Sequence, residues 1–414
     1  MRMILVDDGR HELGPMTDLR AVFELRTGIR TTAERLARLV KTEPAGCWVP
    51  QHLAELVRSR VPYPVNELPG SNDHVTLVNG RWVTPGMQIA PHRDEVVVDA
   101  DGVMLVASLR AQDAMALLET GEMPKNARCR EALDEKLIAA PWDVMRLLPD
   151  AMAMDFHDSR IAEGAVFGPE VFVIGDQPLE VDAGARVYPG VTFDVEHGPI
   201  LVEADAVIRP GAILCGPCAI GRGTTVMDRA HIKAGTSIGP VCKVGGEVGG
   251  TIFQGFANKS HEGHLGDSWV GEWVNIGAGT TNSNLLNTYG EIMMRTEPDG
   301  QRRRTGLRYL GSIIGDHVKL AICTRLMTGT VLGTGAMIAS STPPPVTVDR
   351  FAWMTDEGQR RYRLDKFLEV ARTMMSRRAQ TLEPVLETAI TELYERHNTG
   401  EGQSDQGGAG TKIG

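Results

Sequence analysis

The spacing of hydrophobic positions changes twice along the chain and divides it into three parts. Residues 1–158 mix short apolar runs such as "HVTLVNG" with segments of helical period such as "TAERLARLVK", a mixture typical of an α/β domain. From about residue 170 aliphatic residues recur at every sixth position instead. Residues 351–397 return to a helical pattern, and the polar tail at 398–414 lacks the apolar groups needed to pack, so we expect disorder there.

The six-residue period predicts a parallel β-helix over residues 159–350. Neither an amphipathic helix nor an alternating strand has this period, and a β-sandwich with evenly spaced strands is the main alternative. The period does not fix the hand of the coil, although the general rule for parallel crossovers favours a right-handed one. The turn "EPDGQ" within residues 287–311 predicts a hairpin that interrupts the coils. The aliphatic positions are Val202, Ile208, Leu214, Ile220, Val226, Ile232, Ile238 and Val244, followed by Ile314, Leu320, Leu326, Leu332 and Ile338.

Composition narrows the classes of function. The formal net charge of −10 argues against a general nucleic-acid surface, which needs a basic footprint. We expect no membrane span, because no run of 18 apolar residues is present, and the N-terminal stretch does not read as a secretory signal. The six scattered cysteines, with one isolated CxxC at 215–218, favour a reduced, cytoplasmic setting over a metal site.

Polar side chains gather where the rhythm is disturbed, in "HEGHLGDSWVGEWVNIGAGTTNSN" at residues 261–284. The six-residue phase persists through Val270 and Ile276, so a rigid scaffold continues beneath these side chains. An imidazole can take a proton from an attacking amine, and amide or backbone N–H groups can stabilise a developing oxyanion. Each such residue alone could merely complete the hydrogen bonds of a coil corner, but the cluster favours a functional site.

This stretch resembles the acetyltransferase half of the bifunctional N-acetylglucosamine-1-phosphate uridyltransferase/glucosamine-1-phosphate acetyltransferase family. The family pattern HLTYLGDxxIGxxVNIGAGTxxxN aligns with it without a gap. "TIFQGFANKSHEGHLG" and "NLLNTYG" are similar to a shorter, divergent branch of sugar nucleotidyltransferases. The resemblance covers most of the chain and implies a left-handed β-helix, a homotrimer, and acetyl-CoA bound between subunits.

The roles of individual residues follow from this resemblance alone. His261 falls on the family's catalytic base, and Asn275 and Asn284 fall on its substrate-binding amides. His264 stands where the family has a substrate-binding tyrosine, and Ile322 replaces a serine near the cofactor thiol. The remaining implied contacts are Lys243 and Lys259 with the substrate phosphate, and Ala278, Ala321 and Ser340 with acetyl-CoA.

The N-terminal loop "LVDDGRHELGPMT" resembles LAAGxGTRxxPLT, the phosphate-binding loop of sugar-1-phosphate nucleotidyltransferases. Asp8 takes the place of the first glycine and Glu12 that of the arginine, so we expect the loop to repel a triphosphate. Arg81 takes the place of the aspartate that holds Mg²⁺, and a guanidinium cannot ligate a divalent ion. Asp73 is a candidate replacement for that ligand.

Three arginines are candidates for binding phosphate in this domain: Arg10, Arg20 and Arg26. Arg10 lies within the loop, and the other two stand where the divergent branch also carries arginines. The alternative for Arg20 and Arg26 is simple pairing with Glu24 and Asp18.

The sequence therefore predicts a transferase that acetylates an amino-sugar-1-phosphate with acetyl-CoA at the β-helix. The N-terminal domain could in addition join a sugar-1-phosphate to a nucleoside triphosphate, with Mg²⁺ if that site is active. The alternatives are a sugar-1-phosphate nucleotidyltransferase only, a zinc enzyme that uses His231, His261 and His264, and a non-catalytic trimeric scaffold that binds nucleotide sugars.

Overall fold

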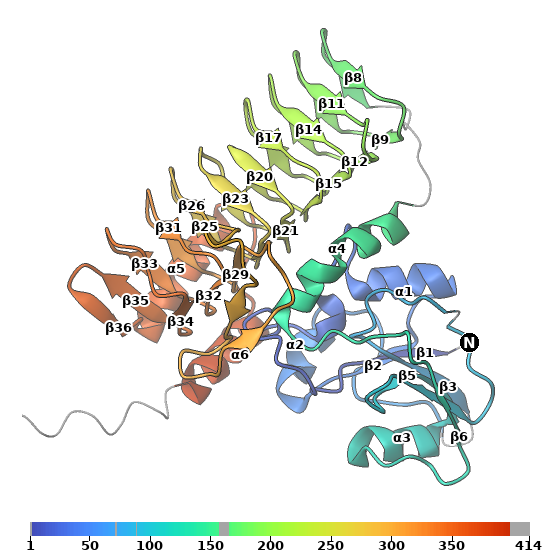
Figure 1. Ribbon diagram of the computed structural model, residues 1–414. Coiled ribbons are helices and arrows are strands. Elements are labelled where there is room, and N and C mark those ends of the chain that lie inside the picture. The colour runs from blue at the N-terminus through green and yellow to red at the C-terminus, as the bar shows by residue number, and fades with distance from the viewer. Residues whose placement is uncertain (1, 71–72, 88, 157–164, 398–414) are drawn as a thin grey trace, which may run out of the picture.

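The computed structural model describes residues 2–70, 73–87, 89–156 and 165–397. It shows an α/β domain beside a long prism of stacked coils, with two helices at the C-terminal end of the prism (Figure 1). The boundary predicted at 158/159 and the tail predicted at 398–414 lie outside the described residues.

The N-terminal domain is a mixed sheet with helices, which confirms the predicted α/β class. The sheet has the order β2-β1-β3-β5-β4-β6, and β1 runs parallel to both of its neighbours. The carboxyl ends of these three strands therefore meet at one edge, the usual position for a ligand in an open α/β sheet. The strands are β1 (Met3–Val6), β2 (Gly46–Trp48), β3 (His74–Asn79), β4 (Glu95–Val98), β5 (Met104–Arg110) and β6 (Arg128–Glu131). The helices are η1 (Val22–Glu24), α1 (Thr32–Val40), η2 (Gln51–Leu53), α2 (Ala54–Arg58), α3 (Ala111–Thr120) and α4 (Pro141–Asp155).

The prism is the predicted parallel β-helix, and it is left-handed. Successive strands pass in turn through three sheets, and each pairs with the strand one coil earlier, as in the register Val202 to Ile220 to Ile238. All thirteen aliphatic positions of the six-residue period are buried, because each points its side chain into the prism.

One sheet of the prism, here called the domain-facing sheet, lies against the N-terminal domain. Its strands are β9 (Leu179–Val181), β12 (Ile200–Val202), β15 (Cys218–Ile220), β18 (Thr236–Ile238), β21 (Ile252–Phe253), β24 (Trp269–Val270), β29 (Ser312–Ile314), β32 (Thr330–Leu332) and β34 (Thr347–Val348). Its outward residues, including Leu201, Ile252 and Ile313, share an apolar cluster with Trp142 and Leu148 of α4. This cluster joins the two domains.

The second sheet, the helix-facing sheet, carries the C-terminal helices over its last coils. Its strands are β7 (Val166–Phe167), β10 (Arg186–Val187), β13 (Val207–Ile208), β16 (Thr225–Val226), β19 (Lys243–Val244), β22 (Asn258–Lys259), β25 (Asn275–Ile276), β30 (Lys319–Leu320), β33 (Met337–Ala339), β35 (Ala352–Thr355) and β36 (Gly358–Arg361). Trp273 beside this sheet packs with Phe367 of α5 (Leu364–Ser376) and Leu393 of α6 (Pro384–Arg396).

The third sheet, the open sheet, has exposed outward side chains, among them His231 and Glu247. Its strands are β8 (Phe172–Ile174), β11 (Thr192–Asp194), β14 (Ile213–Cys215), β17 (His231–Ile232), β20 (Glu247–Gly249) and β23 (His264–Gly266), and the short pair β26 (Thr281–Asn282) and β31 (Arg325–Leu326) follows. Among the described residues, α4 packs on the domain-facing sheet and α5 and α6 pack on the helix-facing sheet, and none of these helices covers the open sheet.

Two hairpins complete the fold, and only one was predicted. β27 (Met293–Met294) and β28 (Arg303–Arg304) pair antiparallel, which confirms the excursion at 287–311. The expectation of a wholly helical segment from residue 351 is wrong at its start, because β35 and β36 form a hairpin there. β35 pairs with β33 and so extends the helix-facing sheet by one more strand. Within the described residues no helix is both long and apolar enough to cross a membrane.

Candidate functional site

Three residues predicted from the resemblance lie along one edge of the prism. Asn258 pairs with Asn275, so His261 stands level with Ala278 one coil later. A hydrogen bond across the same corner agrees with this register: the Gly279 N–H donates to the Glu262 carbonyl at 3.1 Å. The next coils place Ile322 and then Ser340 at that level. His261 is exposed, and Ala278 and Ser340 are partly exposed. The edge therefore offers an imidazole at one end of a row of mostly small residues.

A second polar group lies on the open sheet, beside this edge. Glu247 pairs with His264 in register, and its carboxylate lies 3.5 Å from Nδ1 of His264 and 3.2 Å from the amine of Lys233. The hydrogen bond from Lys233 keeps the pKa of Glu247 below its usual value. A carboxylate on Nδ1 favours the tautomer in which Nε2 can accept a proton. His264 therefore lies beside a carboxylate that could orient its ring.

Asn284 completes this group from the far side of β23. Its side-chain nitrogen donates to Asp267 at 2.6 Å, and both this nitrogen and Nε2 of His264 lie over Gly266. A Cβ at Gly266 would come within 2.7 Å of that Nε2, so only glycine leaves the space. The amide of Asn284 and the imidazole of His264 are thus packed closely over the backbone of Gly266, and their outer edges are presented on the open sheet.

Two predicted substrate residues lie elsewhere. Lys243 and Asn275 point outward from the helix-facing sheet, and together with Arg377 and Arg378 they line a cavity of about 140 Å³ below the end of α5. Asn275 is held there by the side-chain amide of Asn258 at 2.8 Å. Within one chain these two residues are therefore separated from His264 and Asn284 by an edge of the prism.

The prediction that Lys259 clamps a phosphate at the surface is wrong. Lys259 pairs with Val244, an inward position, and its side chain is buried inside the prism. Its amine donates to the carbonyls of Gly245 and His261 at 2.8 and 3.0 Å, and burial lowers its pKa to about 8. Lys259 therefore fixes the corner that carries His261.

The edge is compatible with acetyl-CoA. Ala278, Ala321 and Ser340 stand within one residue of a straight line over successive coils, and Gly277 packs directly on the backbone of Ala321. Small side chains in a row leave room for an extended pantetheine chain. Ile322 is 71% exposed on this row and would supply an apolar contact instead of a hydroxyl.

In the N-terminal domain, a cavity of about 450 Å³ opens at the carboxyl ends of β1 to β3 and is lined by residues of the loop. Asp8 does not repel anions as predicted, because Arg81 binds its two oxygens at 3.0 and 2.6 Å. Burial acts to raise the pKa of Asp8, but the hydrogen bonds and charge of Arg81 hold it below the usual value. Glu12 is likewise paired, with Arg303 of the hairpin. The two acidic substitutions in the loop are therefore compensated.

The same pairing leaves no fit for Mg²⁺. The carboxylate of Asp8 is bound by Arg81, and both oxygens of Asp7 accept hydrogen bonds from the N–H groups of Gly9 and Val22. Asp73 is wrong as a replacement ligand, because it precedes the six-residue strand β3 and lies roughly 20 Å from the loop. Across the described ranges no three His, Cys, Asp or Glu side chains are placed to hold a metal ion, which also leaves the zinc alternative without a ligand set.

Of the three candidate arginines, only Arg10 lines the N-terminal cavity. Arg20 is buried and pairs with Asp316 at 2.9 Å and Glu272 at 3.3 Å, and Arg26 donates to the backbone of Ile29 and Gln254. Burial and these ion pairs rule out the predicted phosphate role for Arg20, whose alternative partner Glu24 contributes only a weaker charge interaction. For Arg26, which is partly exposed, the phosphate role stays a prediction. Both residues connect the N-terminal domain to the prism.

Sequence reasoning missed Glu247 and the pairing of Asp8 with Arg81. The spacing of His231, Glu247 and His264, 16 and 17 residues apart, is close to one coil and could have placed them in one column. No sequence signal connects Asp8 with Arg81, which are 73 residues apart.

Comparison with known proteins agrees with this two-domain arrangement. Residues 3–161 match the family model described as sugar nucleotidyl transferase. The bifunctional sugar-1-phosphate nucleotidylyltransferase/acetyltransferase of Sulfurisphaera tokodaii is 32% identical over 143 residues, which are 34% of this chain and 35% of that protein. The bifunctional protein GlmU of Heliobacterium modesticaldum is 24% identical over 243 residues, which are 58% of this chain and 48% of that protein.

Over these segments the chain is similar at low identity to the bifunctional transferases. It spans only about a third to a half of the length of the curated relatives it matches. Among solved structures, the polysialic acid O-acetyltransferase OatWY is 10% identical and covers 49% of this chain and 88% of its own, with a TM-score of 0.18.

Proposed function

We propose that this protein is a sugar-phosphate-processing transferase that acetylates the amine of an amino-sugar-1-phosphate with acetyl-CoA at the β-helix. The observation that carries the proposal is the arrangement of His261 and Ala278 on one edge, with His264 and Asn284 on the adjoining open face. The names of the relatives, which combine nucleotidyl and acetyl transfer, support the same reading.

Acetyl-CoA, held along the row from Ala278 to Ser340, would supply the acetyl group as a thioester. His261, or His264 beside it, takes the proton that the sugar amine loses as its nitrogen bonds to the carbonyl carbon. The backbone N–H of Ala278 stabilises the oxygen that becomes negative, and the carbon–sulfur bond then breaks to release the thiol. Asn284 orients the sugar.

A homotrimer is part of this proposal, because the open face and the first coils expose apolar side chains. Phe172, Val173 and Ile174 of β8 are each 45–57% exposed, which is characteristic of an interface. A neighbouring subunit on this face would bring its own Lys243 and Asn275 toward the imidazoles. The cytoplasmic setting belongs to the same proposal and agrees with six free cysteines.

Nucleotidyl transfer at the N-terminal cavity is a second candidate function. The family match over residues 3–161 favours it, and the cavity at the ends of β1 to β3 has room for a nucleotide. Because Asp8 is committed to Arg81, no magnesium-assisted step is part of the proposal. A nucleotide-sugar-binding domain without turnover is the alternative that the same cavity allows.

The test is a panel of amino-sugar-1-phosphates with acetyl-CoA, with the acetylated product measured by mass spectrometry and pyrophosphate release followed in parallel with nucleoside triphosphates. We expect His261→Ala to abolish acetyl transfer and to leave the oligomeric state unchanged. His264→Ala is the matched variant, and the larger loss identifies the base. Full activity in both variants would remove the imidazoles from the mechanism.

A further inference from the structure

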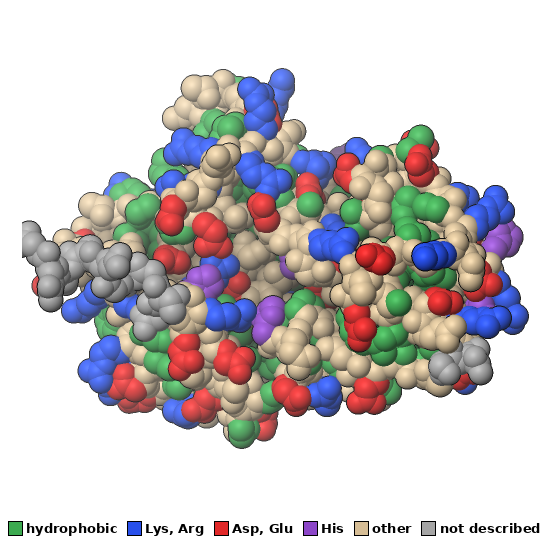
Figure 2. Space-filling model, turned by 90° about the horizontal axis from the view of Figure 1, so that it is seen from below, with side chains coloured by type: hydrophobic (Ala, Val, Ile, Leu, Met, Phe, Trp, Pro, Cys, Tyr) green, Lys and Arg blue, Asp and Glu red, His purple; other side chains and the backbone are tan. Residues whose placement is uncertain are grey.

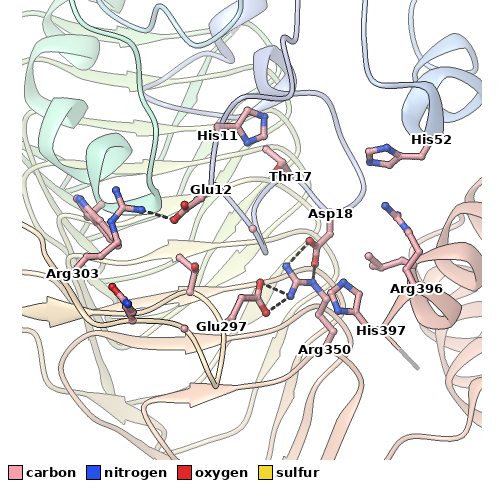
Figure 3. Close-up of a pocket in the computed structure, with 16 residues that line it drawn as sticks. His11, Glu12, Thr17, Asp18, His52, Glu297, Arg303, Arg350, Arg396 and His397 are labelled. Atoms are coloured by element: carbon pink, nitrogen blue, oxygen red, sulfur yellow. Dashed lines mark hydrogen bonds and ion pairs between the residues drawn. The ribbon is translucent and has the colours of Figure 1, made fainter. Parts of the chain in front are cut away.

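A second large cavity lies where the N-terminal domain, the hairpin and the last helix meet. Its volume is about 580 Å³, and six separate parts of the chain line it (Figure 3). They are the loop His11–Asp18, η2 at His52, the start of α4 at Trp142, the hairpin of β27 and β28, the turn after β34 at Arg350, and the end of α6. On the face shown in Figure 2, histidine, acidic and basic side chains border a recess near the middle of the molecule. Neither proposed active site uses this cavity.

Most charges in this cavity are already paired. Arg350 is nearly buried and holds Asp18 at 2.8 and 2.9 Å and both oxygens of Glu297 at 2.8 Å, and Arg303 pairs with Glu12. These pairs fix the walls that the loop and the hairpin provide. The charged and polar side chains of these pairs line the cavity and suit the hydroxyl groups of a ligand.

The opposite wall has a different character. His52 from η2 and Arg396 from α6 lie close together on this side of the cavity, and His397 lies beside Arg350 (Figure 3). Partial burial and the charge of Arg396 lower the pKa of His52, while burial and Arg350 lower that of His397. At neutral pH both imidazoles are therefore uncharged next to fixed guanidinium groups, and an added anion would favour their protonation.

We propose that this cavity binds a phosphate monoester of a small hydroxylated metabolite, with the phosphate between His52, Arg396 and His397. The hydroxyl groups would face Glu12 and Glu297 on the other wall. Arginine and protonated histidine donate strong hydrogen bonds to phosphate oxygens, and the cavity is several times larger than the phosphate alone. The loop that lines this cavity with His11 and Glu12 lines the N-terminal cavity with Asp8 and Arg10. An occupant here therefore touches the same loop as a nucleotide there.

Binding should take up protons and strengthen as the pH falls. In the ligand-free protein both histidines have pKa values below 6.5, and a bound dianion raises them. One unit of pKa shift in one histidine corresponds to about a tenfold change in affinity. The charged groups that face His52 are Arg396, Asp7, Glu392 and Asp18, and those that face His397 are Arg350, Asp18, Glu297 and Asp349.

The test uses the full chain and calorimetric titration with three probes: inorganic sulfate, glucose 6-phosphate and glucose. Sulfate keeps its charge between pH 6.0 and 7.5, so we expect its affinity to rise as the pH falls, with proton uptake seen as a dependence on buffer ionisation enthalpy. Glucose 6-phosphate should bind, and glucose should not. Sulfate binding that ignores pH, or equal binding of both sugars, overturns the proposal.

Variants locate the site. Arg396→Gln and His52→Gln should each weaken glucose 6-phosphate binding by about tenfold or more, at the loss of one charge-assisted contact. His52→Gln serves if Arg396→Gln disturbs the fold, which thermal unfolding will reveal. Arg222→Gln, an exposed arginine of the prism that lines neither cavity, is the matched control and should bind as the native chain does. Arg10→Gln changes the arginine of the N-terminal cavity and tests that site instead. The opposite pattern, loss only in Arg10→Gln, would place the anion in the N-terminal cavity and refute the assignment.

Discussion

Replacing Arg20 by methionine tests how the two domains are joined. The Arg20 guanidinium lies 2.9 Å from Asp316 and 3.3 Å from Glu272, donates to the Met16 carbonyl at 2.9 Å, and is almost fully buried. Without it, two carboxylates would face each other with no cation, and Asp316 has almost no access to water. Removing one partner of a buried ion pair costs about 3–5 kcal/mol. We expect Arg20→Met to lose that much in the free energy of unfolding.

Urea unfolding, followed by tryptophan fluorescence, measures this loss. Trp269 lies under Arg20 at 5.8 Å and should report the interface directly. Arg10→Met, an exposed arginine, is the control and should change stability by less than about 0.5 kcal/mol. Adding Asp316→Leu to Arg20→Met should recover part of the loss, because the uncompensated charge is then gone. A loss below about 1 kcal/mol in Arg20→Met would refute the structural role assigned to this residue.

Three further predictions concern the prism. Lys259→Met should lower stability by about 1–3 kcal/mol, because the carbonyls of Gly245 and His261 lose their donor. It should also lower acetyl transfer by freeing the corner of His261, measured as kcat beside Tm, and an unchanged kcat would contradict this. His317 is buried with its pKa well below 6.5, so the unfolded chain binds more protons below that pH and stability falls as the solution is acidified. Asparagine tolerates the positive φ of 59° at this position, so His317→Asn should reduce the loss of unfolding free energy between pH 6.5 and 5, measured by urea titration. If the loss is the same in the variant, other groups cause it. Leu214→Ala, buried between Phe193 and Ile232 inside the prism, should lose about 2–5 kcal/mol in urea unfolding, and a loss near zero would mean that its side chain is not in the core.

The regular part of the fold could be predicted because its signal is local and repeated. Each of the three sides of a coil needs one inward aliphatic side chain, which produces the six-residue spacing. Leu214 and Ile232 could therefore be placed in the core from spacing alone. The hand of the coil is not contained in that spacing, and it came from the resemblance. The hairpin at Ala352–Arg361 was missed, because two four-residue strands beside a strong helical pattern carry little signal of their own.

Charged residues were harder to place, since their roles depend on partners far away in the sequence. The sequence suggests Arg20 as a phosphate ligand, but its partner in the structure is Asp316, 296 residues later. Asp8 reads as repulsive until Arg81 is seen to neutralise it. Lys259 occupies an inward position that normally holds an aliphatic residue. The coil before it is short: Ile238 pairs with Phe253 and Val244 with Lys259, 15 residues apart instead of 18, so the six-residue count from Val244 does not reach Lys259.

The pairing of Arg20 with the prism, and of Arg303 with the N-terminal loop, has a practical consequence. Proteins with two modules are often cut at the linker so that each activity can be assayed alone. Here a cut near residue 158 would strip both fragments of their electrostatic partners and uncover the apolar contacts of α4. Inactive fragments would then reflect the loss of the interface between the two domains. The activities should therefore be assigned by single substitutions in the intact polypeptide.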